Sequence, residues 1–226
     1  MFTLNAVVPW GRSFDEYRRM FSLTDEDLRQ TILGCADGPA SFNVEALARN
    51  VKVISADPLY QWTAADIRRR VAATSADVLE QTRRNHDEFV WREFDSVDTL
   101  GAARMRAMDL FLADYEQKPG AGRYVAAALP ALPFADGAFD IVVCSHFLFL
   151  YTAQTTERFH LESVDELCRV GRDVRIFPLL ALGATPSPYV PAVVEHLSAC
   201  GRKVSIEPVP YEFQRGGNQM LRCLGR

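Results

Sequence analysis

The stretch that decides the fold is Leu132-Pro133-Phe134-Ala135-Asp136-Gly137-Ala138-Phe139-Asp140-Ile141-Val142-Val143-Cys144-Ser145. Its first half has the Pro, Asp and Gly residues of a turn. The apolar run that follows predicts a strand over residues 140–144, since strands of parallel sheets are buried on both faces. Ser145 and His146 follow this strand at its carboxyl end, which is where open α/β sheets bind their ligands.

Strands and helices are predicted to alternate on both sides of this stretch, which indicates an α/β protein. The predicted strands are residues 31–33, 51–56, 124–128, 140–144, 174–177, 204–209 and 218–224. The predicted helices between them include residues 39–49, 155–170 and 191–200. Residues 210–218, between the last two strands, are too few for a crossover helix, so these strands should pair antiparallel.

Residues 58–122 contain no convincing strand, and we expect a helical insert or lid there, between the second and third strands. Thr63 and Ser96 are placed to cap two amphipathic helices in it. Near the N-terminus, Ser13 and Thr24 predict two further capped helices within residues 1–28. We expect a single domain over residues 1–226.

Composition excludes several classes of protein. Apolar residues make up 48% and charged residues 24%, as in globular proteins, and the net charge of −4 argues against a surface dedicated to nucleic acid. The N-terminus has no signal-peptide pattern, and no apolar run is long enough to span a membrane. Five cysteines without C-x-x-C spacing indicate reduced thiols in the cytoplasm and predict no structural metal. The sequence carries no signal for an oligomeric state.

The deciding stretch resembles the LPF-x-D-x-x-FD-x-V signature of the class I S-adenosylmethionine (SAM)-dependent methyltransferases, in their small-molecule-like branch. Two further features are in the family's order: the turn Leu33-Gly34-Cys35-Ala36-Asp37-Gly38-Pro39, and Asp57 after the second strand. The resemblance covers about residues 33–209. It implies a doubly wound, Rossmann-like sheet of seven mostly parallel strands in the order 3-2-1-4-5-7-6, with an antiparallel C-terminal hairpin.

The resemblance also implies that SAM is the methyl donor and S-adenosylhomocysteine (SAH) the product, and that the N-terminal helices of residues 1–28 cover the cofactor. The residues it places at the cofactor are Gly34, Cys35, Ala36 and Gly38 at the methionine part, Asp57 at the ribose, Pro58, Leu59, Ala128 and Leu129 at the adenine, Ser145 and His146 at the methyl end, and Arg12 and Tyr17 at the carboxylate.

Three positions depart from the family pattern. Ile32 stands where an acid is usual, Ala36 stands at a central glycine, and Ala128 stands where an acid often contacts the adenine. These departures put cofactor affinity and adenine selectivity in doubt.

Catalytic and acceptor-binding residues are expected at the same edge of the sheet. His146 is the candidate base, with a histidine hydrogen-bonded to backbone as the alternative, and Tyr151 could bring its hydroxyl to the site. The hairpin loop supplies the candidate acceptor-binding residues Tyr211, Glu212, Arg215 and Asn218. An ordinary hairpin loop is the alternative reading of this segment.

We therefore predict methyl transfer from SAM to a small or medium-sized polar acceptor. The alternatives are a non-catalytic SAM-binding or regulatory protein of the same fold and a methyltransferase acting on protein or RNA. A nicotinamide oxidoreductase is disfavoured by the terminal hairpin. The runs Arg68-Arg69-Arg70 and Arg83-Arg84 predict a solvated helix face, so neither nucleic acid nor a membrane is expected as a partner.

Overall fold

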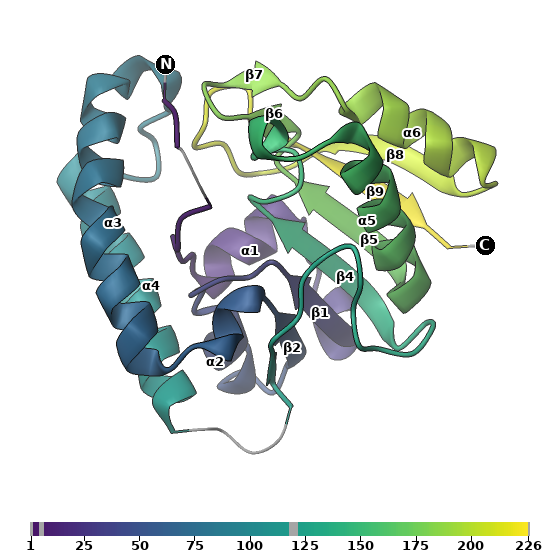
Figure 1. Cartoon of the computed structure of the whole chain (residues 1–226), viewed down its shortest axis with the longest axis horizontal. Coiled ribbons are helices and arrows are strands. Elements are labelled where there is room, and N and C mark those ends of the chain that lie inside the picture. The colour runs from purple at the N-terminus through teal and green to yellow at the C-terminus, as the bar shows by residue number, and fades with distance from the viewer. Residues whose placement is uncertain (1, 5–6, 118–121, 226) are drawn as a thin grey trace.

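The computed structural model describes residues 2–4, 7–117 and 122–225 and is built around one twisted sheet (Figure 1). Its strands are β1 (Thr31–Cys35), β2 (Lys52–Ala56), β3 (Tyr124–Val125), β4 (Phe139–Ser145), β5 (Gly171–Phe177), β8 (Lys203–Pro208) and β9 (Gln219–Leu224). A separate small hairpin is formed by β6 (Leu180–Ala181) and β7 (Thr185–Pro186).

The strand order is β3-β2-β1-β4-β5-β9-β8. The first five strands run parallel, and β9 pairs antiparallel with both β5 and β8. Because β8 and β9 are the sixth and seventh strands of the main sheet, this is the predicted order 3-2-1-4-5-7-6. The predicted fold class is confirmed.

Helices cover both faces of the sheet, and the alternation of side chains along each strand explains why. In β1, Leu33 and Cys35 belong to the core that includes side chains of α5 (Glu157–Val170) and α6 (Val190–Ala199). Ile32 belongs to the core formed with α1 (Phe14–Met20) and α2 (Phe42–Leu47). Both faces are apolar and buried, as a doubly wound sheet requires.

The insert consists mainly of two long helices, α3 (Ala64–Arg84) and α4 (Val97–Glu116), which stand side by side next to the sheet (Figure 1). Thr63 and Ser96 cap them as predicted. Short 3₁₀ turns precede and follow α3, at η2 (Pro58–Gln61) and η3 (His86–Glu88). A third such turn, η4 (Thr152–Gln154), lies between β4 and α5.

The helix predicted at Thr24 is wrong: the segment forms only the 3₁₀ turn η1 (Asp27–Arg29). The Thr24 hydroxyl does accept a 3.1 Å hydrogen bond from the Asp27 amide. The Asp27 carboxylate is held by Arg175, which comes from the middle of β5. The chain enters β1 at Thr31, so only residues 25–30 lie between Thr24 and the strand, and the contact with Arg175 holds Asp27 within them.

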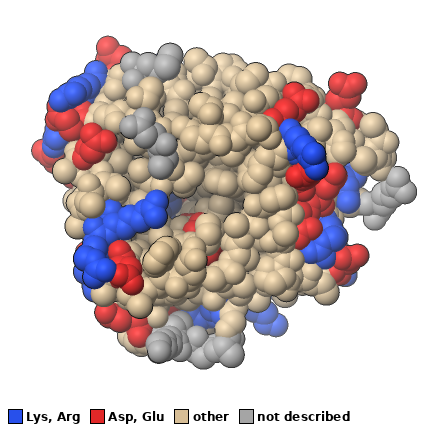
Figure 2. All heavy atoms as spheres, in the orientation of Figure 1, with Lys and Arg blue, Asp and Glu red and all other residues tan. Residues whose placement is uncertain are grey.

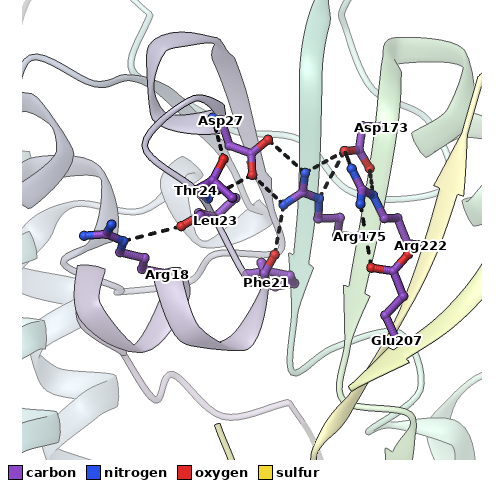
Figure 3. Close-up of polar contacts among 9 residues, drawn as sticks. All are labelled: Arg18, Phe21, Leu23, Thr24, Asp27, Asp173, Arg175, Glu207 and Arg222. Atoms are coloured by element: carbon purple, nitrogen blue, oxygen red, sulfur yellow. Dashed lines mark hydrogen bonds and ion pairs between the residues drawn. The ribbon is translucent and has the colours of Figure 1, made fainter. Parts of the chain in front are cut away.

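Arg175 is the centre of the network in Figure 3 and is only 2% exposed. Its guanidinium donates to both oxygens of Asp27 at 3.0 Å, to Asp173 at 2.7 Å and to the backbone oxygen of Phe21 at 2.9 Å. Asp173 in turn binds Arg222 of β9 at 2.8 Å. The network therefore fixes the connection after α1 to the centre of the sheet.

The third strand is shorter than predicted, with two residues rather than five. Beyond Val125 the chain leaves the sheet and turns back on itself, with an isolated bridge between Ala128 and Ala131. Among the described residues, no helix has the length and apolar character needed to cross a membrane.

Candidate functional site

A cavity of about 240 Å³ lies at the carboxyl ends of β1, β2 and β4. Strand ends form its floor, while the N-terminal segment (residues 2–4 and 7–12) and α3 form its opposite wall. Figure 2 shows this side of the molecule hollowed near its centre, with acidic atoms visible inside and mostly uncharged atoms around the opening. This is the edge at which doubly wound sheets bind ligands.

The turn after β1 carries a buried carboxyl group, that of Asp37, which lines the cavity. It accepts hydrogen bonds from the Tyr17 hydroxyl at 2.8 Å and the Ser55 hydroxyl at 2.6 Å. Burial raises the pKa of Asp37 to about 7, although both hydroxyls oppose that rise. A side chain at Gly34 would put its Cβ 1.9 Å from the Asp37 carboxylate, so Gly34 makes room for this acid.

Ala36 and Gly38 both have the left-handed backbone that this turn needs, with φ of 56° and 53°. The amide of Ala36 donates a 2.8 Å hydrogen bond to the Ala56 oxygen, which holds the turn against β2. An alanine in this conformation is disfavoured by about 1 kcal/mol or more relative to glycine. The alanine at this position is therefore accommodated with some strain.

Asp57, at the end of β2, lies opposite this turn and lines the cavity. One carboxylate oxygen accepts from the Leu59 amide at 2.7 Å and the other from the Gly38 amide at 2.9 Å. Burial raises its pKa, while these two hydrogen bonds act in the opposite direction. Each oxygen still has a lone pair for a ligand hydroxyl, since a carboxylate offers about four acceptor sites.

Arg12 supplies a cation to the cavity. Its guanidinium donates to the Trp10 backbone oxygen at 3.1 Å, but its Nε is buried and has no hydrogen-bond partner among the described residues. Burial and then the nearby Arg104 lower the pKa of Arg12. A buried guanidinium with an unsatisfied N–H is a place where an anionic group would be favourable.

Beneath Arg12 lies a buried ion pair between Arg104 of α4 and Glu16 of α1, with a 2.6 Å contact. The other Glu16 oxygen accepts from the Tyr211 hydroxyl at 2.9 Å. Tyr211 thus points into the protein interior rather than toward an acceptor, because its hydroxyl helps to satisfy this carboxylate. With Arg12, the cluster has two guanidinium groups and one carboxylate, which makes this side of the cavity positive.

His146 and Tyr151, the candidate catalytic residues, both line the cavity. The His146 ring lies 3.0 Å from the Ser145 hydroxyl, and its pKa is lowered well below its usual value by burial and by Arg12 and Arg104. The imidazole is therefore neutral near pH 7. The Tyr151 hydroxyl accepts a 3.3 Å hydrogen bond from the Val8 amide, which ties the N-terminal segment to the site.

The other hairpin residues proposed for the acceptor lie outside the lining formed by the described residues. Arg215 donates to the backbone oxygens of Asp87 at 3.0 Å and Phe89 at 3.2 Å, so it fastens the hairpin loop to the insert. Glu212 accepts the Gly216 amide within the loop, and Asn218 is exposed. Polar residues leave β8 at the expected edge, but their side chains turn toward the protein backbone or solvent.

The structure brings most of the predicted cofactor residues together around one space. Those in the lining are Arg12, Tyr17, Cys35, Ala36, Gly38, Asp57, Pro58, Ala128, Leu129, Ser145 and His146. Gly34 and Leu59 are not among the lining residues: Gly34 makes room for Asp37, and Leu59 packs against the core of the insert. Asp37 could have been found from its place inside the quoted turn.

Most of the remaining lining residues were not predicted individually. Many of them are apolar side chains from the N-terminal segment, α3 and the loops near η3, β6 and β9, among them Phe2, Val78, Phe89, Leu182 and Phe213. The N-terminal part has no helical or strand periodicity, so only the resemblance, which places Arg12 and Tyr17 at the cofactor, predicts that this segment covers the cavity.

One group of three metal-binding residue types lies away from the cavity, on α5 and α6. Asp165, His196 and Cys200 bring one ligand atom each to within 4.8 Å of one another. The His196 ring is already 2.9 Å from both Asp165 oxygens.

Comparison with known proteins gives one clear relative. No family model matches the sequence. The uncharacterized protein MJ0045 of Methanocaldococcus jannaschii is 34% identical over 220 residues, which cover 96% of each chain.

Similar solved structures include the magnesium protoporphyrin IX methyltransferase of Synechocystis PCC 6803 with bound SAM, at 11% identity and a TM-score of 0.47, covering 89% of this chain and 73% of that one. A SAM-dependent methyltransferase from Aquifex aeolicus has 14% identity and a TM-score of 0.45, covering 93% and 88%. The relationship that defines the family is the one in sequence: the chain belongs to the same protein family as MJ0045 of M. jannaschii.

Proposed function

We propose that this protein binds SAM in the cavity and transfers its methyl group to a small-molecule acceptor. The observation that carries the proposal is the pairing of two groups in one cavity of this sheet topology. Asp57 lies at the end of β2, and Arg12, with its unsatisfied Nε, lines the same space. Together they suit a ligand with a ribose and a carboxylate.

The described residues fit this cofactor in chemistry as well as in position. Asp57 would accept hydrogen bonds from the ribose hydroxyls of SAM, and Arg12 would bind its carboxylate. The carboxyl group of Asp37 would accept hydrogen bonds from its ammonium group. Ala128 and Leu129 supply apolar surface beside the place for the adenine. Ile32 stands where the family usually has an acid before the turn. Asp37, whose carboxylate lies against Gly34 within the turn, would take the place of that acid.

SAM supplies a methyl group already activated by a sulfonium, so the protein's task is to orient the acceptor and exclude water. The walls from the N-terminal segment and α3 exclude water. His146 is neutral and can accept a proton, although its lowered pKa makes it a weak base. That strength suits an acceptor that loses its proton readily or needs no base.

A small molecule fits the site better than a macromolecule. The N-terminal segment lies across the cavity, fixed by hydrogen bonds from the Phe2 amide to Glu88 and from the Val8 amide to Tyr151. The opening in Figure 2 is surrounded mostly by uncharged atoms, whereas a nucleic-acid channel needs a basic path. We propose a cytoplasmic location, where the thiols of the five cysteines would stay reduced.

Calorimetric titration with SAH tests the cofactor assignment directly. We expect saturable binding by the wild-type protein. Asp57→Asn should weaken it by roughly 1.5–3 kcal/mol, because the amide keeps one acceptor for the Leu59 cap but loses the charged hydrogen bonds to the ligand. Asp109→Asn, on the exposed surface of α4, is the matched control and should bind SAH like the wild type.

Absence of saturable binding of SAM and SAH, together with binding of NAD, would refute the proposal. Tight SAH binding without methyl transfer to any of a broad set of small acceptors would favour the non-catalytic alternative.

A further inference from the structure

The part of the cavity farthest from the strand ends is built almost wholly from apolar and aromatic side chains. We call this part the aromatic chamber and define it by Phe2, Val78, Phe89, Leu182 and Phe213. Phe89 and Phe213 stack with ring centres 4.9 Å apart, and Phe2 meets Phe89 edge to face at 5.8 Å. Five separate segments of the chain contribute these residues, so the tertiary fold assembles the chamber.

The few polar side chains in this part of the lining are engaged with the backbone. The Thr82 hydroxyl donates to the Val78 oxygen at 2.8 Å, and the Gln214 amide donates to the Ala181 oxygen at 2.8 Å. Glu88 accepts the Phe2 amide with both carboxylate oxygens, at 3.1 and 3.0 Å. A polar ligand would exchange its hydrogen bonds to water for few new ones here, which is unfavourable.

We infer that the aromatic chamber binds a flat, largely apolar aromatic molecule, which on the proposed function is the methyl acceptor. Aromatic side chains favour stacked or edge-to-face contacts with such a ligand. Tyr151 and His146 line the cavity between the chamber and the region proposed for the cofactor. Their polar atoms would bind one polar group at the end of the ligand. This replaces the expectation of a polar acceptor, which depended on Tyr211, Glu212 and Arg215 facing the site.

The chamber can be tested without the cofactor, using 2-naphthol as the probe and calorimetry as the readout. For a ligand of this size in a preformed apolar site, we expect a dissociation constant of about 10–100 μM. Leu182→Asp places a charge in the chamber wall from the β6–β7 turn and should weaken binding at least tenfold, by roughly the penalty for an unpaired charge. Leu47→Asp, the same change at a 51% exposed position on α2, should leave it unchanged.

Phe213→Ala provides a second variant should Leu182→Asp fail to fold. It removes the ring stacked on Phe89 and should weaken naphthol binding about tenfold. Lack of saturable naphthol binding by the wild type would overturn the inference. Binding to Leu182→Asp or Phe213→Ala as tight as to Leu47→Asp would overturn it too.

The SAH titration separates this inference from the proposed function on which it rests. The protein could bind naphthol, respond to the variants and still have no affinity for SAM or SAH. That result would support the aromatic chamber as a ligand site and refute the proposed methyltransferase function. SAH binding without naphthol binding would support the cofactor site and refute the inference about the aromatic chamber.

Discussion

Replacing Arg104 by methionine should test the buried ion pair beneath the cavity. Arg104 is 1% exposed and donates to Glu16 at 2.6 Å. Methionine fills a similar elongated space without the charge. The change therefore leaves the Glu16 carboxylate buried, with hydrogen bonds from Ser13 and Tyr211 but without its directly bonded cation.

The size of the effect follows from the pKa of Glu16. Burial raises this pKa, but Arg104, Arg12 and the Ser13 amide together outweigh burial, and the value falls from 4.5 to about 2. That difference corresponds to ~3 kcal/mol of stabilisation at neutral pH, in line with ~3–5 kcal/mol for breaking a buried pair. In a domain of this length the melting temperature should fall by ~6–12 °C.

The pH dependence has a definite sign. The folded-state pKa of Glu16 is lower than in the unfolded chain, so the stabilisation is present above about pH 4.5 and is lost as pH falls toward 2. Chemical denaturation of wild type and Arg104→Met should differ by ~3 kcal/mol at pH 7 and by ~2 kcal/mol at pH 3.5.

Two results would contradict this reasoning. One is a melting temperature for Arg104→Met within about 2 °C of wild type at pH 7. The other is an additive loss in the double variant Glu16→Gln, Arg104→Met, because paired residues should show a coupling energy of at least ~0.5 kcal/mol.

Three further outcomes are expected. Arg175→Met should destabilise the fold by ~3–5 kcal/mol, because it leaves the Asp27 carboxylate in Figure 3 without its cation; a loss below ~1 kcal/mol in urea denaturation would show that the network is dispensable. Arg215→Ala should leave SAH affinity within a few-fold and the melting temperature within about 2–4 °C of wild type, because the residue is exposed. Amide hydrogen exchange at residues 86–89 should accelerate, and unchanged exchange would argue against a role of Arg215 in fastening the hairpin loop. Ala36→Gly should fold normally and bind SAH at least as tightly as wild type by calorimetry, since glycine relieves the left-handed backbone; a several-fold loss would mean that the methyl group contributes to the site.

The sheet was predictable because buried parallel strands leave a strong apolar signal. The run ending at Ser145 predicted a buried strand, and the short connection before β9 predicted the antiparallel pairing of the last two strands. The strand order followed from the resemblance to the methyltransferase family. Elements with few residues left no such signal: β3 ends after Val125, and the β6–β7 hairpin was not anticipated. At Thr24 the reciprocal hydrogen bonds with Asp27 form, but they precede the 3₁₀ turn η1 with Glu26 at its N-cap, instead of the predicted α-helix.

The site was predictable only where the backbone places the residue. Asp57, Ala36 and His146 follow strands, so their positions in the cavity come directly from the topology. Side-chain direction is decided by partners distant in sequence. Tyr211 leaves β8 at the predicted edge, yet its hydroxyl turns to Glu16 near the other end of the chain.

The N-terminal segment has a kinetic consequence. In its described residues 2–4, 7 and 8, the hydrogen bonds to the remainder of the protein are few: the amides of Phe2, Thr3 and Val8 donate to Glu88, Gln81 and Tyr151, Gln154 donates to the Leu4 oxygen, and Arg70 donates to the Val7 oxygen. A segment held in this way opens at a far lower free energy than global unfolding. On the proposed function, ligand exchange would then follow the opening rate of this segment rather than fluctuations of the sheet, and product release would limit turnover when the transfer step is faster.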